Sequence, residues 1–114
     1  MQLVAGDRRK SARFDVRLAL RYRLSQKGIE NRWCAGVTRD MSKDGLVFKS
    51  RRPLPVGSHV EVRIDWPVPY HAIYPMDLQI TGFVVRNEHG RSAVRISSHR
   101  FLIHSEAESL VKTA

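Results

Sequence analysis

Short segments in which apolar and polar residues alternate are the feature that most limits how this chain can fold. Between Val16 and Leu24 nearly every second residue is apolar, and the positions between them carry mostly arginine. The same spacing returns between Val60 and Trp66, with charged residues at the intervening positions. A period of two turns one side of a segment towards a core and the other towards water. This pattern is typical of a β-strand rather than a helix.

Six such segments are predicted, and residues that favour turns separate them. The predicted strands cover residues 16–24, 32–39, 46–49, 60–66, 78–86 and 92–96. Gly82, inside the fifth strand, indicates a bulge or a close backbone contact. The stretch from Pro67 to Met76 holds three prolines and is predicted to loop out. This succession of short strands predicts a mainly all-β fold, a small six-stranded antiparallel barrel or sandwich.

The chain has 114 residues, which suits one domain with one modest core. We assign residues 15–114 to this domain and expect residues 1–14 to form a flexible, arginine-rich segment in front of it. The apolar run Phe101–Ile103 is expected to close one end of the barrel, with a docking patch for a partner as the alternative. Ser105–Glu108 matches a capping box, which predicts a short C-terminal helix.

Positive charge is concentrated in the first half of the chain. Residues 1–57 hold 14 Lys or Arg against 5 Asp or Glu, whereas residues 58–114 hold 6 of each. The whole net charge of +9 therefore lies in the first half. A one-sided field of this kind favours an anionic partner. Ordinary solvated arginines that serve solubility are the alternative interpretation.

Cys34 is the only cysteine, so a disulfide within the chain is excluded and a cysteine-based zinc site lacks ligands. It stands beside Trp33 and Ala35 in an apolar run, which predicts a buried thiol. No apolar run approaches the ~18–20 residues of a membrane span. Residues 1–13 lack the apolar core of a signal peptide. These features together predict a cytoplasmic protein.

Arg8, Arg9 and Arg13 form the first of two clusters with a candidate chemistry, just before the first predicted strand. A guanidinium group donates paired hydrogen bonds to phosphate oxygens or to the guanine acceptors O6 and N7. Its plane also stacks on a base. Arg9 and Arg13 are four residues apart, so in a loop they could contact a small ligand from two sides. A basic tail without a ligand is the alternative.

The second cluster is Asp-Met-Ser-Lys-Asp-Gly, which contains Asp40, Ser42 and Gly45. A carboxylate at Asp40 can accept hydrogen bonds from both donors on the Watson–Crick edge of guanine. The Ser42 hydroxyl can donate to a phosphate or a base, and Gly45 permits a positive φ or a close backbone approach. A plain turn between two strands is the alternative. Together the clusters suit a ligand with phosphates and guanines, and neither suits bond-breaking chemistry.

The two clusters together resemble the signature of PilZ domains. In that family, Arg-x-x-x-Arg precedes the first strand and Asp-x-Ser-x-x-Gly follows the second. The resemblance extends over most of the chain, because the six-strand layout also looks like the family. The matching positions here are Arg9, Arg13, Asp40, Ser42 and Gly45, with similar features in the turn at Asp65–Pro67 and the strand Gly82–Arg86.

PilZ domains are bacterial receptors for the second messenger cyclic di-GMP, built on a six-stranded antiparallel barrel. The resemblance implies that Arg9 and Arg13 grip phosphates and guanine faces. It also implies that Asp40 and Ser42 meet a guanine, and that Gly45 shapes the turn. The expected function is therefore a cyclic di-GMP receptor without catalytic activity, with the messenger as ligand and no cofactor.

Arg8 precedes the motif and extends it to Arg-Arg-x-x-x-Arg. In this family the extra arginine accompanies a stacked, intercalated pair of nucleotides, so two ligand molecules per chain are predicted. The arginine segment would fold over the ligand and act as the switch, because ordering a segment costs entropy until contacts form. The resemblance leaves the outer wall of the site open, and Arg86 is a candidate for it.

Other function classes fit these residues less well. The five histidines are scattered, and no spacing indicates a catalytic triad or a metal site. A small basic barrel that binds single-stranded nucleic acid fits the charge, but only 8% of the residues are aromatic. A PilZ module that binds protein and has lost its ligand is the third possibility. The downstream partner is left open among motility, secretion and biofilm polysaccharide machinery.

Overall fold

The computed structural model describes residues 13–14, 16–25 and 32–104, with side chains from Val16 onward. The predicted C-terminal helix and most of the arginine segment lie outside the described residues. Within the described part of the chain, no helix has the length and apolar character needed to cross a membrane. The strands are β1 (Arg13–Phe14), β2 (Ala19–Leu24), β3 (Cys34–Ser42), β4 (Gly45–Lys49), β5 (His59–Tyr70), β6 (Tyr74–Glu88) and β7 (Arg91–Ile103).

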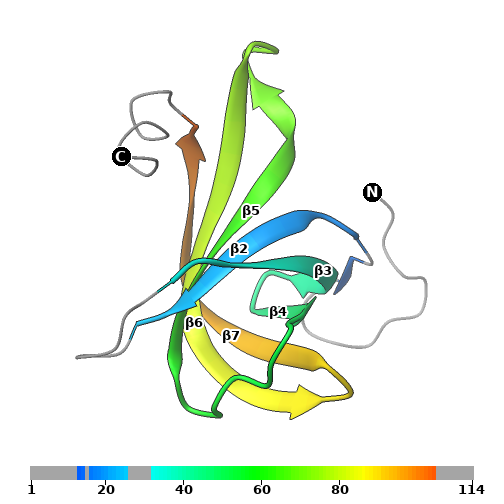
Figure 1. Cartoon of the computed structure of the whole chain (residues 1–114). Helices are drawn as coiled ribbons and strands as arrows, with labels where there is room; N and C mark the ends of the chain where they lie inside the picture. The colour runs from blue at the N-terminus through cyan, green and yellow to red at the C-terminus, as the bar shows by residue number, and fades with distance from the viewer. Residues whose placement is uncertain (1–12, 15, 26–31, 105–114) are drawn as a thin grey trace.

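Six of these strands form a closed antiparallel barrel (Figure 1). The strand order is β1-β3-β2-β5-β6-β7-β4, and a further pairing between β3 and β4 closes the ring. The short β1 is not part of the ring, because it pairs only with the end of β3. The predicted six-stranded antiparallel barrel is therefore confirmed.

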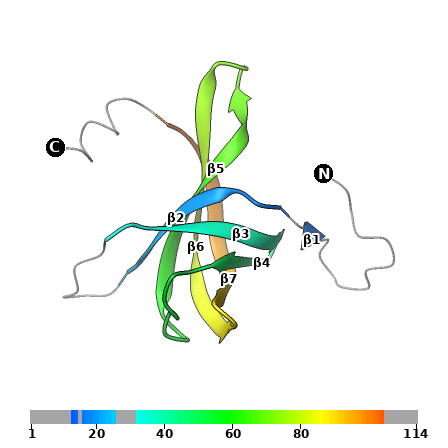
Figure 2. The same ribbon diagram turned by 45° about the vertical axis from the view of Figure 1, so that its right-hand side comes forward.

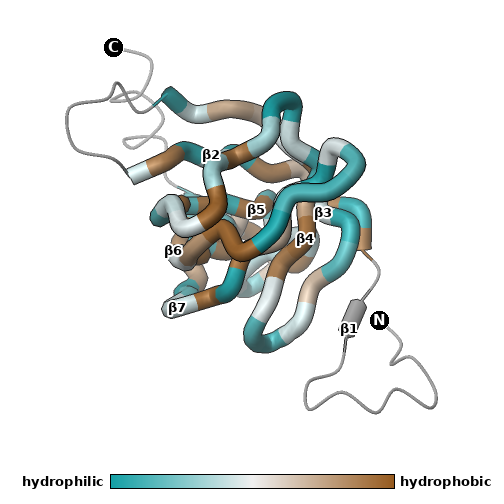
Figure 3. The backbone as a smooth tube through the Cα atoms, turned by 90° about the horizontal axis from the view of Figure 1, so that it is seen from below, coloured by the Kyte–Doolittle hydropathy of each residue, from teal (hydrophilic) through white to brown (hydrophobic). Residues whose placement is uncertain are grey.

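The barrel interior holds one apolar core to which every strand of the ring except β3 contributes large buried side chains. Hydrophobic and hydrophilic residues alternate along these strands, as the colours of Figure 3 show. Alternation buries one face of each strand and leaves the other in water. The side chains that are almost completely buried include Leu46, Phe48, Val60, Val62, Ile64, Ile80, Val84 and Val94.

Gly82 is confirmed as a bulge and a close-packing point. The register of β6 with β7 shifts between Thr81 and Gly82. A Cβ at this position would overlap the carbonyl oxygen of Arg95 on the neighbouring strand. The two backbones approach so closely here that only glycine fits.

A buried threonine directs the chain from β1 to β2. Both strands lie on the same side of β3, because Val37 pairs with β2 and β4 while Met41 pairs with β1 and β4. Residues 16–18 cross between them. The Thr38 side chain, 0% exposed, donates a hydrogen bond to the Val16 carbonyl and accepts one from the Leu18 N–H, both at 2.7 Å.

The prolines near the tip of the β5–β6 hairpin do not form the predicted loop. β5 continues through Pro67 and Pro69 to Tyr70, and β6 begins at Tyr74. The prediction of a turn at Asp65–Pro67 is wrong for the same reason. Beyond Ile64, no described strand pairs with the outer edge of β5, so a residue without an N–H loses no ladder hydrogen bond there.

Two further predictions are wrong because strands extend past the barrel. Cys34 is exposed rather than buried, since the β3–β4 pairing begins only at Val37 and leaves the start of β3 uncovered. Its thiol points to the Arg32 carbonyl at 3.8 Å. The run Phe101–Ile103 does not close the barrel but continues β7 beside β6, where Phe101 is 49% exposed.

Replacing Thr38 with valine tests the role of the crossing. Thr38→Val keeps the side-chain shape but leaves the Val16 carbonyl and the Leu18 N–H without their hydroxyl partner. We expect the free energy of unfolding, measured in urea, to fall by about 2–3 kcal/mol, since each unpaired buried polar group costs about 1–3 kcal/mol. The matched control is Thr81→Val, which removes a hydroxyl whose hydrogen bond to Ser98 is exposed, so that water can replace it, and it should cost less than about 0.5 kcal/mol. Equal losses would contradict the assignment.

Candidate functional site

The strand register brings the two sequence clusters to one place. On the β1–β3 side, the backbone of Arg13 lies directly opposite Ser42. On the β4–β7 side, Gly45 lies directly opposite Arg95. Ser42 and Gly45 flank the short turn that joins β3 to β4, so these four positions form one row across four strands. The backbone of the last arginine of the first cluster therefore lies in the same row as the serine and glycine of the second.

The Ser42 hydroxyl holds the turn. It accepts a hydrogen bond from the Gly45 N–H at 3.1 Å and makes a longer contact, 3.4 Å, as donor to the Gly45 carbonyl. The turn is tighter than predicted, because β3 runs through Ser42 and only Lys43 and Asp44 connect the strands. An O–H donor at 3.4 Å makes a weak bond. The hydroxyl proton is therefore available to a ligand while its oxygen stays bonded to Gly45.

Gly45 does not have a positive φ, which was the first of the two properties that the sequence suggested for it. Of the described glycines, Gly57 and Gly90 have positive φ values. A Cβ on Gly45 would meet nothing closer than the Val94 carbonyl oxygen at 3.6 Å, an ordinary contact. The fold itself therefore does not require glycine here, unlike at Gly82. What remains of the prediction is a close approach from outside the protein.

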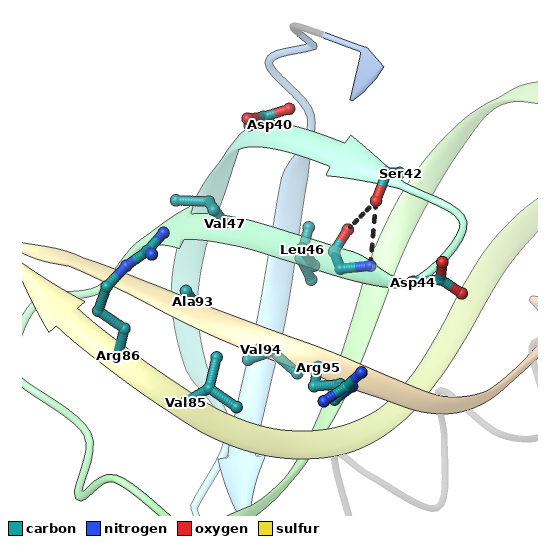
Figure 4. Close-up of a pocket in the computed structure, with 11 residues that line it drawn as sticks. Asp40, Ser42, Asp44, Leu46, Val47, Val85, Arg86, Ala93, Val94 and Arg95 are labelled. Carbon is teal, nitrogen blue, oxygen red and sulfur yellow. Dashed lines mark hydrogen bonds between the residues drawn. The ribbon is translucent and has the colours of Figure 1, made fainter. Parts of the chain in front are cut away.

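An open pocket of about 400 Å³ lies on the outer face of the barrel around this row (Figure 4). Its volume falls within the range of small-molecule sites. Asp40 and Ser42, two of the predicted ligand-binding residues, line it from β3, and both are half-buried. The remaining lining residues are Asp44, Gly45, Leu46, Val47, Val85, Arg86, Ala93, Val94 and Arg95.

Two arginines from the far strands face this pocket. Arg86 belongs to β6 and Arg95 to β7, and both are exposed. The register of β6 shifts between Val84 and Arg86, and this bulge lets the consecutive residues Val85 and Arg86 both line the pocket. Arg86 was a candidate from the sequence, whereas Arg95 was missed. Alternation indicated that Arg95 faces outward, but not that its strand lies beside β4.

The charges that line the pocket cancel. Asp40 and Asp44 supply two carboxylates, and Arg86 and Arg95 supply two guanidinium groups. Net positive charge for an anionic ligand must therefore come from residues outside this lining. Arg8 and Arg9, the predicted ligand-binding arginines of the first cluster, lie outside the described residues.

A different group of arginines, outside both sequence clusters, surrounds Trp33 on the outer face of β2 and β5. Here Arg23 also donates to Glu61 at 2.9 Å, and Gln79 donates to the other carboxylate oxygen at 2.6 Å. Burial, the largest single effect, would raise the pKa of Glu61, but these hydrogen bonds and the positive charges of Arg23 and Arg63 together lower it. This group is thus a paired network within the barrel wall. The guanidinium carbons lie 4.4, 5.4 and 5.6 Å from the Trp33 ring centre for Arg23, Arg63 and Arg21.

Comparison with known proteins gives one family and one fold. The PilZ domain family matches residues 7–108. A crystal structure of the PilZ domain of CeSA from a cellulose-synthesizing bacterium has a TM-score of 0.54 and 17% identity, covering 86% of this chain and 87% of that chain. A search of curated proteins gives no match.

A second similar structure is the Bacillus subtilis inhibitor of motility (MotI/DgrA), with a TM-score of 0.59 and 14% identity. The alignment covers 91% of this chain but 47% of that one, so this chain spans about half of its length. At such identities the two structures establish the fold alone. The family match covers most of the sequence and includes both clusters, so the chain belongs to the PilZ domain family.

Proposed function

We propose that this domain is a receptor for cyclic di-GMP, which binds on the outer face of the barrel across β3, β4 and β7. PilZ domains are in general receptors for this messenger. The observation that carries the proposal is the register, in which Arg13 lies opposite Ser42 and Gly45 opposite Arg95. The messenger has two phosphates and two guanines, and it requires cations for the former and hydrogen-bond acceptors for the latter.

Each group of the proposed site has a distinct role. Asp40 accepts hydrogen bonds from a guanine edge, and the Ser42 hydroxyl donates to the ligand in place of its weak bond to Gly45. Arg9 and Arg13 bind phosphates and stack on guanine faces. On the far side of the pocket, Arg86 and Arg95 offer further donors, as Figure 4 makes plain.

Balanced charge in the described pocket makes the N-terminal arginines decisive. A dianionic ligand gains little net attraction from a wall with equal numbers of carboxylates and guanidinium groups. Arg8, Arg9 and Arg13 would supply the missing positive charge. Binding would then hold the segment 1–14 against the barrel, and the ordered segment would relay the signal by changing the surface that other proteins meet. No step of this mechanism is catalytic.

Titration calorimetry with cyclic di-GMP tests the proposal. The wild-type domain should bind, and Arg9→Ala and Asp40→Ala should each weaken the affinity at least about tenfold, or about 1.4 kcal/mol. Arg51→Ala and Asp65→Ala are matched controls at exposed positions outside the pocket, and they should bind like the wild type. Unchanged affinity in both pocket variants would refute the receptor proposal.

The same titration, repeated with a single-stranded oligonucleotide at low and moderate salt, separates the rival function. Binding of a nucleic-acid polymer falls steeply with salt, because it releases counterions from many phosphates. A dinucleotide held in a pocket releases few. We expect messenger affinity to change little over this range. A preference for the oligonucleotide that disappears with added salt would favour the nucleic-acid alternative.

Arg8 should determine how many nucleotides bind. We propose that it supports the second molecule of an intercalated pair, since a second dianion requires additional positive charge beside the first. The wild type should give a calorimetric stoichiometry of two messengers per chain. Arg8→Ala should give one, with the domain still folded. A stoichiometry of one for the wild type would contradict this assignment without affecting the pocket itself.

Gly45 offers a test that separates folding from binding. A methyl group there meets no atom of the protein closer than 3.6 Å, so Gly45→Ala should change the free energy of unfolding by less than about 0.5 kcal/mol. It stands directly opposite Arg95 in the pocket wall, where it would collide with a ligand lying close to the backbone. We expect messenger affinity to fall at least about tenfold. Native affinity in this variant would show that no ligand approaches Gly45.

A further inference from the structure

Three strands continue beyond the barrel as a three-stranded part of the same sheet. β2 pairs with β5 only as far as Ile64, and β4 pairs with β7 only between Arg91 and Arg95. Past these points β5, β6 and β7 remain paired with one another and rise from the barrel (Figures 1 and 2). We call this part the extension. It carries most of the exposed large hydrophobic side chains, namely Val68, Tyr70, Ile73, Tyr74, Phe101 and Ile103.

One face of the extension continues the apolar face of the barrel interior. Phe101 pairs with the buried Leu78, and Met76 pairs with both Trp66 and Ile103. Residues directly opposite on antiparallel strands share a face. Trp66 and Phe101 pack edge to face, with ring centres 5.2 Å apart. Yet Phe101 is 49% exposed and Ile103 46%, so a core-like surface is left open to solvent.

The two edges of the extension differ in a way that favours one of them for pairing. The outer edge of β5 contains Pro67 and Pro69, which lack N–H groups and discourage addition of another strand. β7 contains no proline between Ser97 and Ile103. Among the described residues, no strand pairs with the outer edge of β7 over that range. This edge therefore presents an unblocked row of backbone donors and acceptors.

An apolar groove of about 270 Å³ runs beside this edge, between the extension and the β3–β4 turn. Basic residues stand on both sides of this edge. Lys43 lines the groove. Arg100 belongs to β7 itself and is exposed on the opposite face from Phe101, where its Nε donates to Gln79 at 2.7 Å. Asp44 lines the pocket on the other side of the turn instead. The lining residues are Met41, Ser42, Lys43, Leu78, Ile80, Ile96, His99 and Phe101.

We propose that the free edge of β7 docks an extended segment of a partner protein in which apolar and acidic residues alternate. The segment adds a strand to β7 through backbone hydrogen bonds, the mode known as β-strand addition. Its apolar side chains cover the face that holds Phe101 and Ile103. Its acidic side chains, on the opposite face, meet Arg100. This surface shares only Ser42 with the lining of the messenger pocket, and its test is made without messenger.

The probe is a fluorescent peptide of about eight residues in which valine and glutamate alternate, the length of an ordinary strand. We expect fluorescence anisotropy to report binding to the full chain. In an isomer with all valines in one block, a strand cannot place the valines on one face and the glutamates on the other. This isomer should bind at least about tenfold more weakly. Equal binding of the two isomers would show a general affinity for acidic peptides and overturn the proposal, as would binding of neither.

Charge reversal identifies the edge. Arg100→Glu lies at an exposed position, so it should stay folded and weaken the alternating peptide at least about tenfold. It should favour a second peptide in which lysine replaces glutamate. Val56→Glu, at an exposed apolar residue far along the chain, is the control and should leave both affinities unchanged. An Arg100→Glu variant that binds like the wild type would place the peptide elsewhere and reject the β7 edge.

Two other occupants give different results. If a second copy covers this face, the wild type will be a dimer by sedimentation and Phe101→Glu will be a monomer. If the chain's own C-terminal residues cover it, the full chain will not bind the peptide and a chain ending at His104 will. Either result would overturn the proposal, whereas a monomeric full chain that binds the alternating peptide supports it.

Discussion

The hydroxyl group of Thr38 is the interaction on which the position of the candidate site depends. It joins β3 to both ends of the crossing 16–18, and it lies where water cannot substitute for it. Its two bonds give partners to backbone groups of the half-buried residues Val16 and Leu18, as folded proteins generally require. The crossing in turn sets β1 beside the last residues of β3. A core hydrogen bond thus determines that Arg13 arrives opposite Ser42.

The local sequence pattern was sufficient to predict the strands. It was insufficient where the end of a strand or the burial of a residue depends on a neighbouring strand. Alternation depends only on which face is buried, so it identified every strand of the barrel. Whether Pro67 and Pro69 end a strand depends on whether another strand pairs with that edge of β5. The pairing of β2 with β5 ends at Ile64, before the prolines. Whether Cys34 is covered depends in the same way on where β4 begins to pair with β3. Such information lies in the topology and not in the segment itself.

The candidate site divides along the same line. Residue type and spacing were enough to single out Asp40, Ser42 and Gly45, because their chemistry is visible in the sequence. Arg95 could not be assigned, since β7 becomes a neighbour of β4 only when the sheet closes. The other arginine of the pocket wall, Arg86, faces the pocket because of a bulge that no residue type in β6 indicates. Of the two reasons given for Gly45, the positive φ does not hold, and the close backbone approach of a ligand stays a prediction.

The turn between β3 and β4 belongs to two surfaces at once. Ser42 lines both the pocket on the outer face and the groove beside the β7 edge. In the proposed mechanism, the domain transmits its signal through different affinities of its surfaces in different states. The turn consists of two residues held by one hydroxyl group. A ligand that takes the proton of this hydroxyl therefore changes the contacts of a residue that belongs to both walls. Thermodynamic linkage then makes the effect mutual. A partner segment bound to β7 would change the affinity for the messenger by the same factor as the messenger changes the affinity for the segment.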